Sequence, residues 1–301
     1  MYVSRLVYIP ALAALGAIYS ALFPVNKMSA EAGLPYIGYV FWFSLIATIG
    51  LAIPAALRGE LPRLTAPHLR AYAVLGGTGV AIPVPLLTFV APKLPVGIIT
   101  LLLILVPLFT YLLSYLARIE RFRLSGVVGV LFGLGGILLI LIPEVSLPSR
   151  DMVGWVLLGL VAPLCFAACN TMAVYLRPPA SPALAMATGM SACATVMLAP
   201  VMVGTGHAYL FPGPSTAAML VVLYAAAITA VTMTGWFVLV RIIGAVFFSQ
   251  FNYFIVLSGF GWGILLFDEH HGLYVWAATG LTFIGLAIFT RGAHIAGREE
   301  A

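Results

Sequence analysis

Four hydrogen-bonding side chains crowd into residues 249–253, inside an apolar run from Ile243 to Phe267. On a helix with about 100° between successive residues, these side chains fall within an arc of about 160° on one side. Polar groups at membrane depth are costly unless they face protein or a water-filled cavity. Because all four are neutral, the chemistry they offer is hydrogen bonding to a small polar molecule. We therefore expect a substrate-binding wall here, with hydrogen bonds between helices as the alternative. The residues concerned are Ser249, Gln250, Asn252 and Tyr253.

Helix-breaking residues interrupt an earlier apolar segment. Gly76-Gly77-Thr78-Gly79 is followed by Pro83 and Pro85. Proline removes backbone donors, and in the membrane the carbonyls that are freed need other partners. We expect a broken helix that lines a cavity, with a packing kink as the alternative.

Polar and aromatic residues of other apolar runs are further candidates for the binding wall. Each of them could instead bond its own backbone or hold two helices together. They are Thr78, Asn170, Thr229, Thr232, Trp42 and Tyr19.

Ionisable groups are placed away from these candidates. All nine acids and all five histidines fall at the ends of the apolar runs or between them. Proton-coupled export of cationic drugs normally uses a carboxylate at membrane depth, so the pattern argues against it. It also argues against an enzyme, because a nucleophile or an aspartyl pair would have no partner. The three cysteines lack metal-ligand spacing, and we expect no metal and no cofactor.

The composition requires a membrane protein. Of 301 residues, 63% are hydrophobic and only 8% are charged, and the mean hydropathy is +1.13. One soluble core cannot hide that much apolar surface. We predict an all-α polytopic membrane protein with ten transmembrane helices, the first of which is a membrane helix rather than a cleavable signal peptide. The predicted helices cover residues 5–24, 36–57, 69–91, 95–117, 124–143, 152–176, 183–204, 216–240, 243–267 and 272–291.

Basic residues are distributed unevenly between the two sides of these ten helices. Eleven of the fourteen Lys and Arg residues fall on one side, and the other side holds Lys27, Lys93 and Arg150. By the positive-inside rule, both termini lie in the cytoplasm. The formal charge of +5 is spread over short loops, so it reflects orientation in the membrane and does not indicate nucleic acid binding.

The two halves of the chain are weakly similar. A shift of 147 residues lays Gly97 on Gly244, and sixteen residues separate Glu120 from Gly136 and Glu269 from Gly285. Five helices per half is an odd number, so the second half is inverted relative to the first, as in many secondary transporters. We expect a first repeat over residues 1–146, an inverted second repeat over 147–292, and a cytoplasmic tail over 293–301.

These features resemble the EamA-type repeats of the drug/metabolite transporter superfamily, and within it the YddG-like amino-acid exporters. The resemblance implies a central cavity, a bend at Pro107, and packing of the fifth and tenth helices on the outside, where the glycines of the fifth helix are contact points. The residues that carry it are Pro95-Val96-Gly97, Pro107, Glu120, Gly129, Gly133, Gly135 and Gly136, then Gly244, Ser249-Gln250, Gly259, Gly263, Glu269, Gly280 and Gly285.

The sequence therefore predicts a multi-pass exporter of small metabolites, amino acids among them, in the cytoplasmic (inner) membrane. It works by alternating access through an uncharged cavity, as a facilitator or an exchanger. A proton-driven antiporter of cationic drugs that uses Glu120 or Glu269 is the alternative, and a scaffold without transport is a third hypothesis. The expected partners are a small-molecule substrate and the lipid bilayer, and the expected state is a monomer, with a dimer as the alternative.

Overall fold

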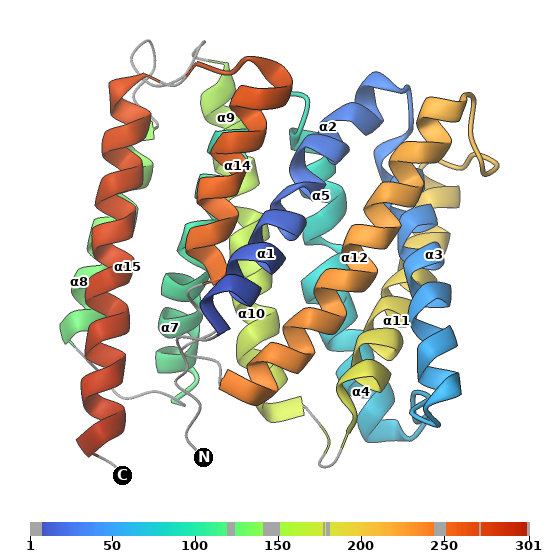
Figure 1. The fold of residues 1–301 in the computed structure, drawn as a ribbon, viewed down its shortest axis with the longest axis horizontal. Coiled ribbons are helices and arrows are strands. Elements are labelled where there is room, and N and C mark those ends of the chain that lie inside the picture. The colour runs from blue at the N-terminus through green and yellow to red at the C-terminus, as the bar shows by residue number, and fades with distance from the viewer. Residues whose placement is uncertain are drawn as a thin grey trace.

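Helices account for all regular structure in the part of the chain that is described. The computed structural model describes residues 8–118, 124–140, 151–176, 178, 181–243, 251–270 and 272–299, and no strand occurs among them (Figure 1). The elements are α1 (Ile9–Ser20), α2 (Leu22–Glu31), α3 (Tyr36–Leu57), α4 (Ala66–Gly76), η2 (Gly77–Ala81), α5 (Pro83–Val90), α6 (Val96–Leu102), η3 (Leu103–Leu105), α7 (Val106–Leu116), α8 (Leu124–Ile140), α9 (Met152–Gly159), α10 (Val161–Leu176), α11 (Ala183–Gly204), α12 (Thr216–Ile243), α14 (Phe251–Phe267) and α15 (Leu273–Glu299).

Seven helical stretches in the described residues are long and apolar enough to cross a membrane. A crossing needs about 20 residues, since a helix rises about 1.5 Å per residue through a hydrocarbon layer of about 30 Å. The seven are Ile9–Glu31, Tyr36–Leu57, Ala66–Val90, Val96–Leu116, Met152–Ala173, Ala183–Gly204 and Thr216–Leu239. Three shorter apolar helices accompany them, Leu124–Gly136, Phe254–Phe267 and Leu273–Gly285.

The helices stand roughly side by side, so the bundle has two ends (Figure 1). We call the end where α2 and α14 finish and α3 begins the distal end, which is at the top of Figure 1. The proximal end is where α1 begins and α3 finishes.

The first helix is longer than its hydropathy predicts. The sequence places its end at residue 24, but α2 continues from α1 through Ala21 as far as Glu31. Two polar residues of this extension, Asn26 and Ser29, are buried and bonded: the Tyr39 hydroxyl donates to Asn26 Oδ1 (3.1 Å) and the Ser29 hydroxyl donates to the Asn26 carbonyl (2.7 Å). These bonds offset the cost of burying polar groups, and hydropathy alone does not reveal them.

Proline and glycine interrupt the helix that spans residues 66–90. Residues 77–81 form a π-helical turn, in which the Ile82 amide donates to the Gly77 carbonyl (3.0 Å). Pro83 and Pro85 follow at the start of α5 and have no N–H with which to continue an α-helical ladder. A π turn in the middle of a helix is frequently found at functional sites.

Pro107 changes the helical geometry within residues 96–116. Pro107 cannot donate to the Leu103 carbonyl, and the Val106 amide donates to it instead. This bond closes the 3-10 turn η3, so α6 and α7 are two segments joined by a tighter one.

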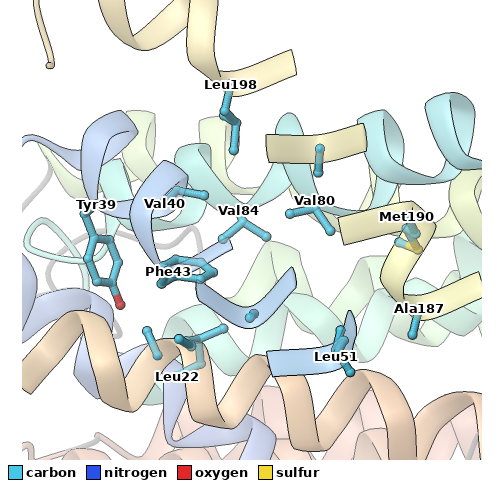
Figure 2. Close-up of a cluster of buried hydrophobic side chains, with 14 of the residues drawn as sticks. Leu22, Tyr39, Val40, Phe43, Leu51, Val80, Val84, Ala187, Met190 and Leu198 are labelled. Atoms are coloured by element: carbon cyan, nitrogen blue, oxygen red, sulfur yellow. The ribbon is translucent and has the colours of Figure 1, made fainter. Parts of the chain in front are cut away.

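Two clusters of buried apolar side chains hold the helices together. The first core joins α1, α6, η3 and α14, and includes Leu12, Leu101, Ile104, Phe251 and Phe260. The second core joins α3, α4, η2, α11 and α12, and includes Tyr39, Val40, Phe43, Val80, Met190 and Leu198 (Figure 2). Because lipid tails are as apolar as these side chains, close packing rather than exclusion from water is the stabilising term.

Helices α8 and α15 form a pair at one edge of the bundle (Figure 1). Their backbones cross closely at Gly285, where an added Cβ atom would lie 2.7 Å from Phe132 Cβ and 2.8 Å from the Gly129 carbonyl oxygen. The pair packs on α7 and η3, on the side away from α3 and α11. Small residues at such crossings allow close approach, which is the role expected for the glycines of α8.

We predict that Gly285→Ala destabilises the protein by about 1–3 kcal/mol, because the new methyl group would force α8 and α15 apart. Thermal unfolding in detergent, followed with a dye that reacts with the three cysteines as they become exposed, measures the effect.

Gly280→Ala is the matched control, because it lies on the same helix and nothing lies within 4 Å of its added Cβ. Equal melting temperatures for the two variants would contradict close packing at Gly285.

Candidate functional site

The polar stretch predicted to bind substrate is described only in part. Ser249 and Gln250 lie outside the described residues, and so does the side chain of Tyr253. Asn252 is the second residue of α14 and is partly buried. Its neighbour Phe251 is buried in the first core. The described part of the predicted wall is therefore the start of α14.

An aromatic contact brings the predicted residue Tyr19 to this place. The ring centroid of Tyr19 lies 5.8 Å from that of Phe251 and 5.9 Å from that of Phe23, which meets it edge to face. Such pairs contribute about 0.5–1.5 kcal/mol beyond the area that they bury. Tyr19 on α1 and Asn252 on α14, 233 positions apart in the chain, thus lie in one region.

Helix α1 packs against both α14 and α12 through glycine contacts. An added Cβ atom on Gly16 would lie 3.2 Å from the Ile255 amide nitrogen, and one on Gly235 would lie 2.6 Å from Leu15 Cδ1. Next to Gly235, Trp236 is partly buried and packs against both hydrophobic cores. This boundary between the cores, where α1, α12 and α14 meet, is called the seam below.

On α12, the two predicted threonines differ in their hydrogen bonding. The Thr232 hydroxyl donates to the carbonyls of Ile228 (2.7 Å) and Thr229 (3.3 Å) on its own helix. The Thr229 hydroxyl is buried without a hydrogen-bond partner in the part of the chain that is described. Leaving a buried hydroxyl without a partner costs about 1–3 kcal/mol. Such groups are rare in folded proteins, and this one therefore indicates a role other than stabilising the fold.

A second group of predicted residues lies around the π turn. An added Cβ atom on Gly79 would lie 2.9 Å from Cys169 Sγ, so η2 and α10 touch here. Thr78 directly precedes Gly79 in the chain, and Asn170 directly follows Cys169. The Thr78 hydroxyl donates to the Val74 carbonyl (2.7 Å). Asn170 is partly buried on α10. The structure thus brings Tyr19 to the start of α14, and sets the turn that holds Thr78 against the helix that holds Asn170.

Trp42 is held by a loop at the distal end. Its indole N–H donates to the Tyr209 carbonyl (3.0 Å), and its ring lies 5.6 Å from that of Phe211. Burial raises the pKa of the Tyr209 hydroxyl to about 12. The position of Trp42 favours an anchoring role for it, since these contacts tie α3 to the loop between α11 and α12.

A cavity opens at the distal end, beside the same loop. It has a volume of about 510 Å³ and is lined by residues that include Tyr36, Phe89, Lys93 and His207. The Tyr36 ring contacts those of Phe89 (5.0 Å) and His207 (4.7 Å). Segments from both halves of the chain therefore meet around it.

Glu269, which the sequence singled out for proton coupling, has several partners at the distal end. Its carboxylate accepts hydrogen bonds from the amides of Val96 (2.8 Å) and Gly97 (3.3 Å) and lies 3.3 Å from Lys27 Nζ. Sequence patterns missed Lys27 as a functional residue, because a single lysine at a helix end is ordinary. Only the fold brings it to an acid 242 positions away.

We predict that Thr229→Val leaves the protein as stable as before or raises its stability by about 1 kcal/mol, because valine has the same shape and removes a hydroxyl without a partner. Thermal unfolding of the purified variant measures this.

Thr232→Val serves as the comparison, since it removes a hydroxyl that is already bonded. If Thr229→Val lowers stability by more than about 1 kcal/mol, its hydroxyl has a partner in the folded protein and is not available to substrate.

Comparison with known proteins agrees with this architecture. No curated protein matches the chain. Fifteen chains of solved structures match it. One of them, a crystal structure of a protein with 17% sequence identity, has a TM-score of 0.63 over 97% of this chain and 99% of its own, so the two share a fold.

The model of the EamA-like transporter family matches residues 7–142. This match covers α1 to α8, and with them Tyr19, the π turn and the 3-10 turn before Pro107. Residues 7–142 are therefore an EamA domain of the drug/metabolite transporter superfamily, and this match indicates a membrane transporter.

Proposed function

We propose that the protein exports small metabolites, most of all amino acids, by alternating access along the seam. The contact between Tyr19 and Phe251 is the observation that carries this proposal, because it sets the helix of the EamA domain that bears Tyr19 against the polar start of α14. Transporters built from inverted repeats bind substrate near the midplane, between the repeats.

Ten membrane crossings are part of this proposal. The three shorter apolar helices have 13, 14 and 13 residues, six or seven fewer than the roughly 20 that a full span needs. In this proposal, flanking residues of the chain complete each of these crossings. Ten crossings, five in each half, would make the second half an inverted copy of the first and would put both termini on the same side. The excess of arginine at the proximal end makes that side the cytoplasm.

Neutral groups would select the substrate. A hydroxyl on Tyr19 and an amide on Asn252 can bond a carboxylate, and the rings of Tyr19 and Trp236 attract an ammonium group by about 0.5–2 kcal/mol. A zwitterion presents both charges close together. An amino acid therefore suits the seam better than an anion or a cation alone.

A proton-driven drug antiporter that uses Glu120 or Glu269 is the second candidate, and of these two acids Glu120 lies outside the described residues. The carboxylate of Glu269 is engaged by two backbone amides and by Lys27 at the distal end, where α14 finishes. These contacts favour a structural role. The uncoupled facilitator or exchanger is therefore the better hypothesis.

We predict that proteoliposomes loaded with an unlabelled amino acid mixture accumulate labelled amino acids by counterflow. Gln250→Ala and Asn252→Ala should each raise KM about tenfold, the effect of losing a hydrogen bond to a charged substrate group worth about 1.4 kcal/mol.

Gly280→Ala, on the exposed face of α15, should transport as the parent protein does. No counterflow with any amino acid would refute the substrate class. Uptake of a cationic dye driven by an acid pulse and lost in Glu269→Gln would support the antiporter instead.

A further inference from the structure

One carboxylate joins three helices at the distal end. Glu269 follows α14 and contacts the first two residues of α6, Val96 and Gly97, together with Lys27 of α2. The carboxylate is almost fully buried, with 8% of the side chain exposed, and Lys27 is 21% exposed. Helices that move relative to one another during transport would have to break these contacts.

The surroundings of Glu269 are shaped for this contact. An added Cβ atom on Gly263 would clash with the carboxylate, so only glycine leaves room for it. Lys27 Nζ also lies 4.0 Å above the ring of Phe267, and this cation–π contact holds the ammonium group in place.

Helix α6 has no cap of its own. It begins after Pro95, and no side chain near in sequence bonds its first amides. The first amides of a helix have no acceptor within it, so they need one from elsewhere. Glu269 supplies that acceptor from 172 and 173 positions away, which links the cap to the packing of α14 on α6.

One turn deeper, the two helices touch directly. An added Cβ atom on Gly259 would clash with the side chain of Thr100, whose hydroxyl donates to the Gly97 carbonyl (2.9 Å). Thr100 is completely buried. Any passage between α6 and α14 at the distal end is therefore shut at two levels, at Glu269 and at Thr100.

We propose that Glu269 is a positioning residue that keeps the distal end of the path closed, with Lys27 as its partner. This inference rests on the proposed alternating access. Charge-assisted hydrogen bonds are strong where water is excluded, and the separated groups are solvated only if water enters. Opening and hydration of the distal end are thus one event, which gives two discrete states rather than a gradual change.

The residues predict a graded series of variants. Lys27→Met removes the ion pair and leaves both backbone bonds of Glu269. Glu269→Gln keeps one acceptor oxygen, and Glu269→Ala removes the cap and the ion pair together. Distal opening should therefore increase in the order Lys27→Met, Glu269→Gln, Glu269→Ala.

The test measures how fast a cysteine at position 100 reacts with a membrane-impermeant maleimide added to intact cells. Thr100→Cys places a thiol of similar size behind Glu269. The labelling rate of the parent chain, which has three cysteines of its own, is subtracted. The remaining rate at position 100 should be low with Glu269 intact and at least about tenfold higher with Glu269→Ala, because that change removes hydrogen bonds to a charged group. The smaller increase with Lys27→Met decides the question if Glu269→Ala does not fold.

Two further cysteines separate the possible outcomes. Leu210→Cys, in the exposed distal loop, reports whether the distal end faces the outside of the cell. If this cysteine is not labelled in intact cells, the Lys27 and Glu269 variants are labelled in inside-out vesicles instead. Ser191→Cys, buried between α11 and α3, reports general loosening.

Faster labelling at position 100 with no change at position 191 supports the proposal. Unchanged labelling at 100, or an equal increase at both positions, overturns it and leaves the amino-acid counterflow expected above unaffected.

Discussion

Helix α14 is held in place by close glycine contacts with α1 and α6. Gly16 of α1 admits its backbone on one side, and Gly259 admits Thr100 of α6 on the other, while Gly263 leaves room for Glu269, which follows α14. In a membrane, where lipid competes equally for apolar side chains, such close contacts are the main source of association between helices. The position of α14 then sets the seam with α1 and α12, the closure of the distal end, and the distance between the two hydrophobic cores.

The two cores divide the bundle in a way that suits a transporter. Each core combines helices from both halves of the chain, so each can remain packed while the boundary between them changes. Packed cores are bistable rather than continuously deformable, and small shifts at a boundary are amplified at the ends of long helices. The π turn before Pro83 and the 3-10 turn before Pro107 are places where a helix can bend with little loss of hydrogen bonding.

Much of the fold was predictable from hydropathy and proline spacing, because apolar runs of about 20 residues have few alternatives in a bilayer. The start of α11 at Ala183 and its end at Gly204 match the prediction, as does the break before Pro83. The extension of α2 to Glu31 was missed, since the hydrogen bonds that Asn26 accepts from Tyr39 and Ser29 offset the cost of burying these polar groups and leave no mark on the hydropathy. The partners of Glu269 were missed for the same reason, as contacts over 172 positions or more leave no local pattern. Of the predicted site, Ser249 and Gln250 lie outside the described residues, Tyr19 meets the start of α14, and Trp42 meets a distal loop.

The most direct measurement of alternating access along the seam is the distance between spin labels at each end of the protein, with and without amino acids. The distal pair joins Leu210, which is exposed beside the second core, to Leu265, which is exposed on α14. The proximal pair joins Leu57 at the end of α3 to Leu116 at the end of α7, and both are exposed. With a millimolar amino acid mixture in proteoliposomes, the account predicts that the distance distribution lengthens for one pair and shortens for the other. Distances that stay unchanged at both ends, or that lengthen at both ends together, would contradict it.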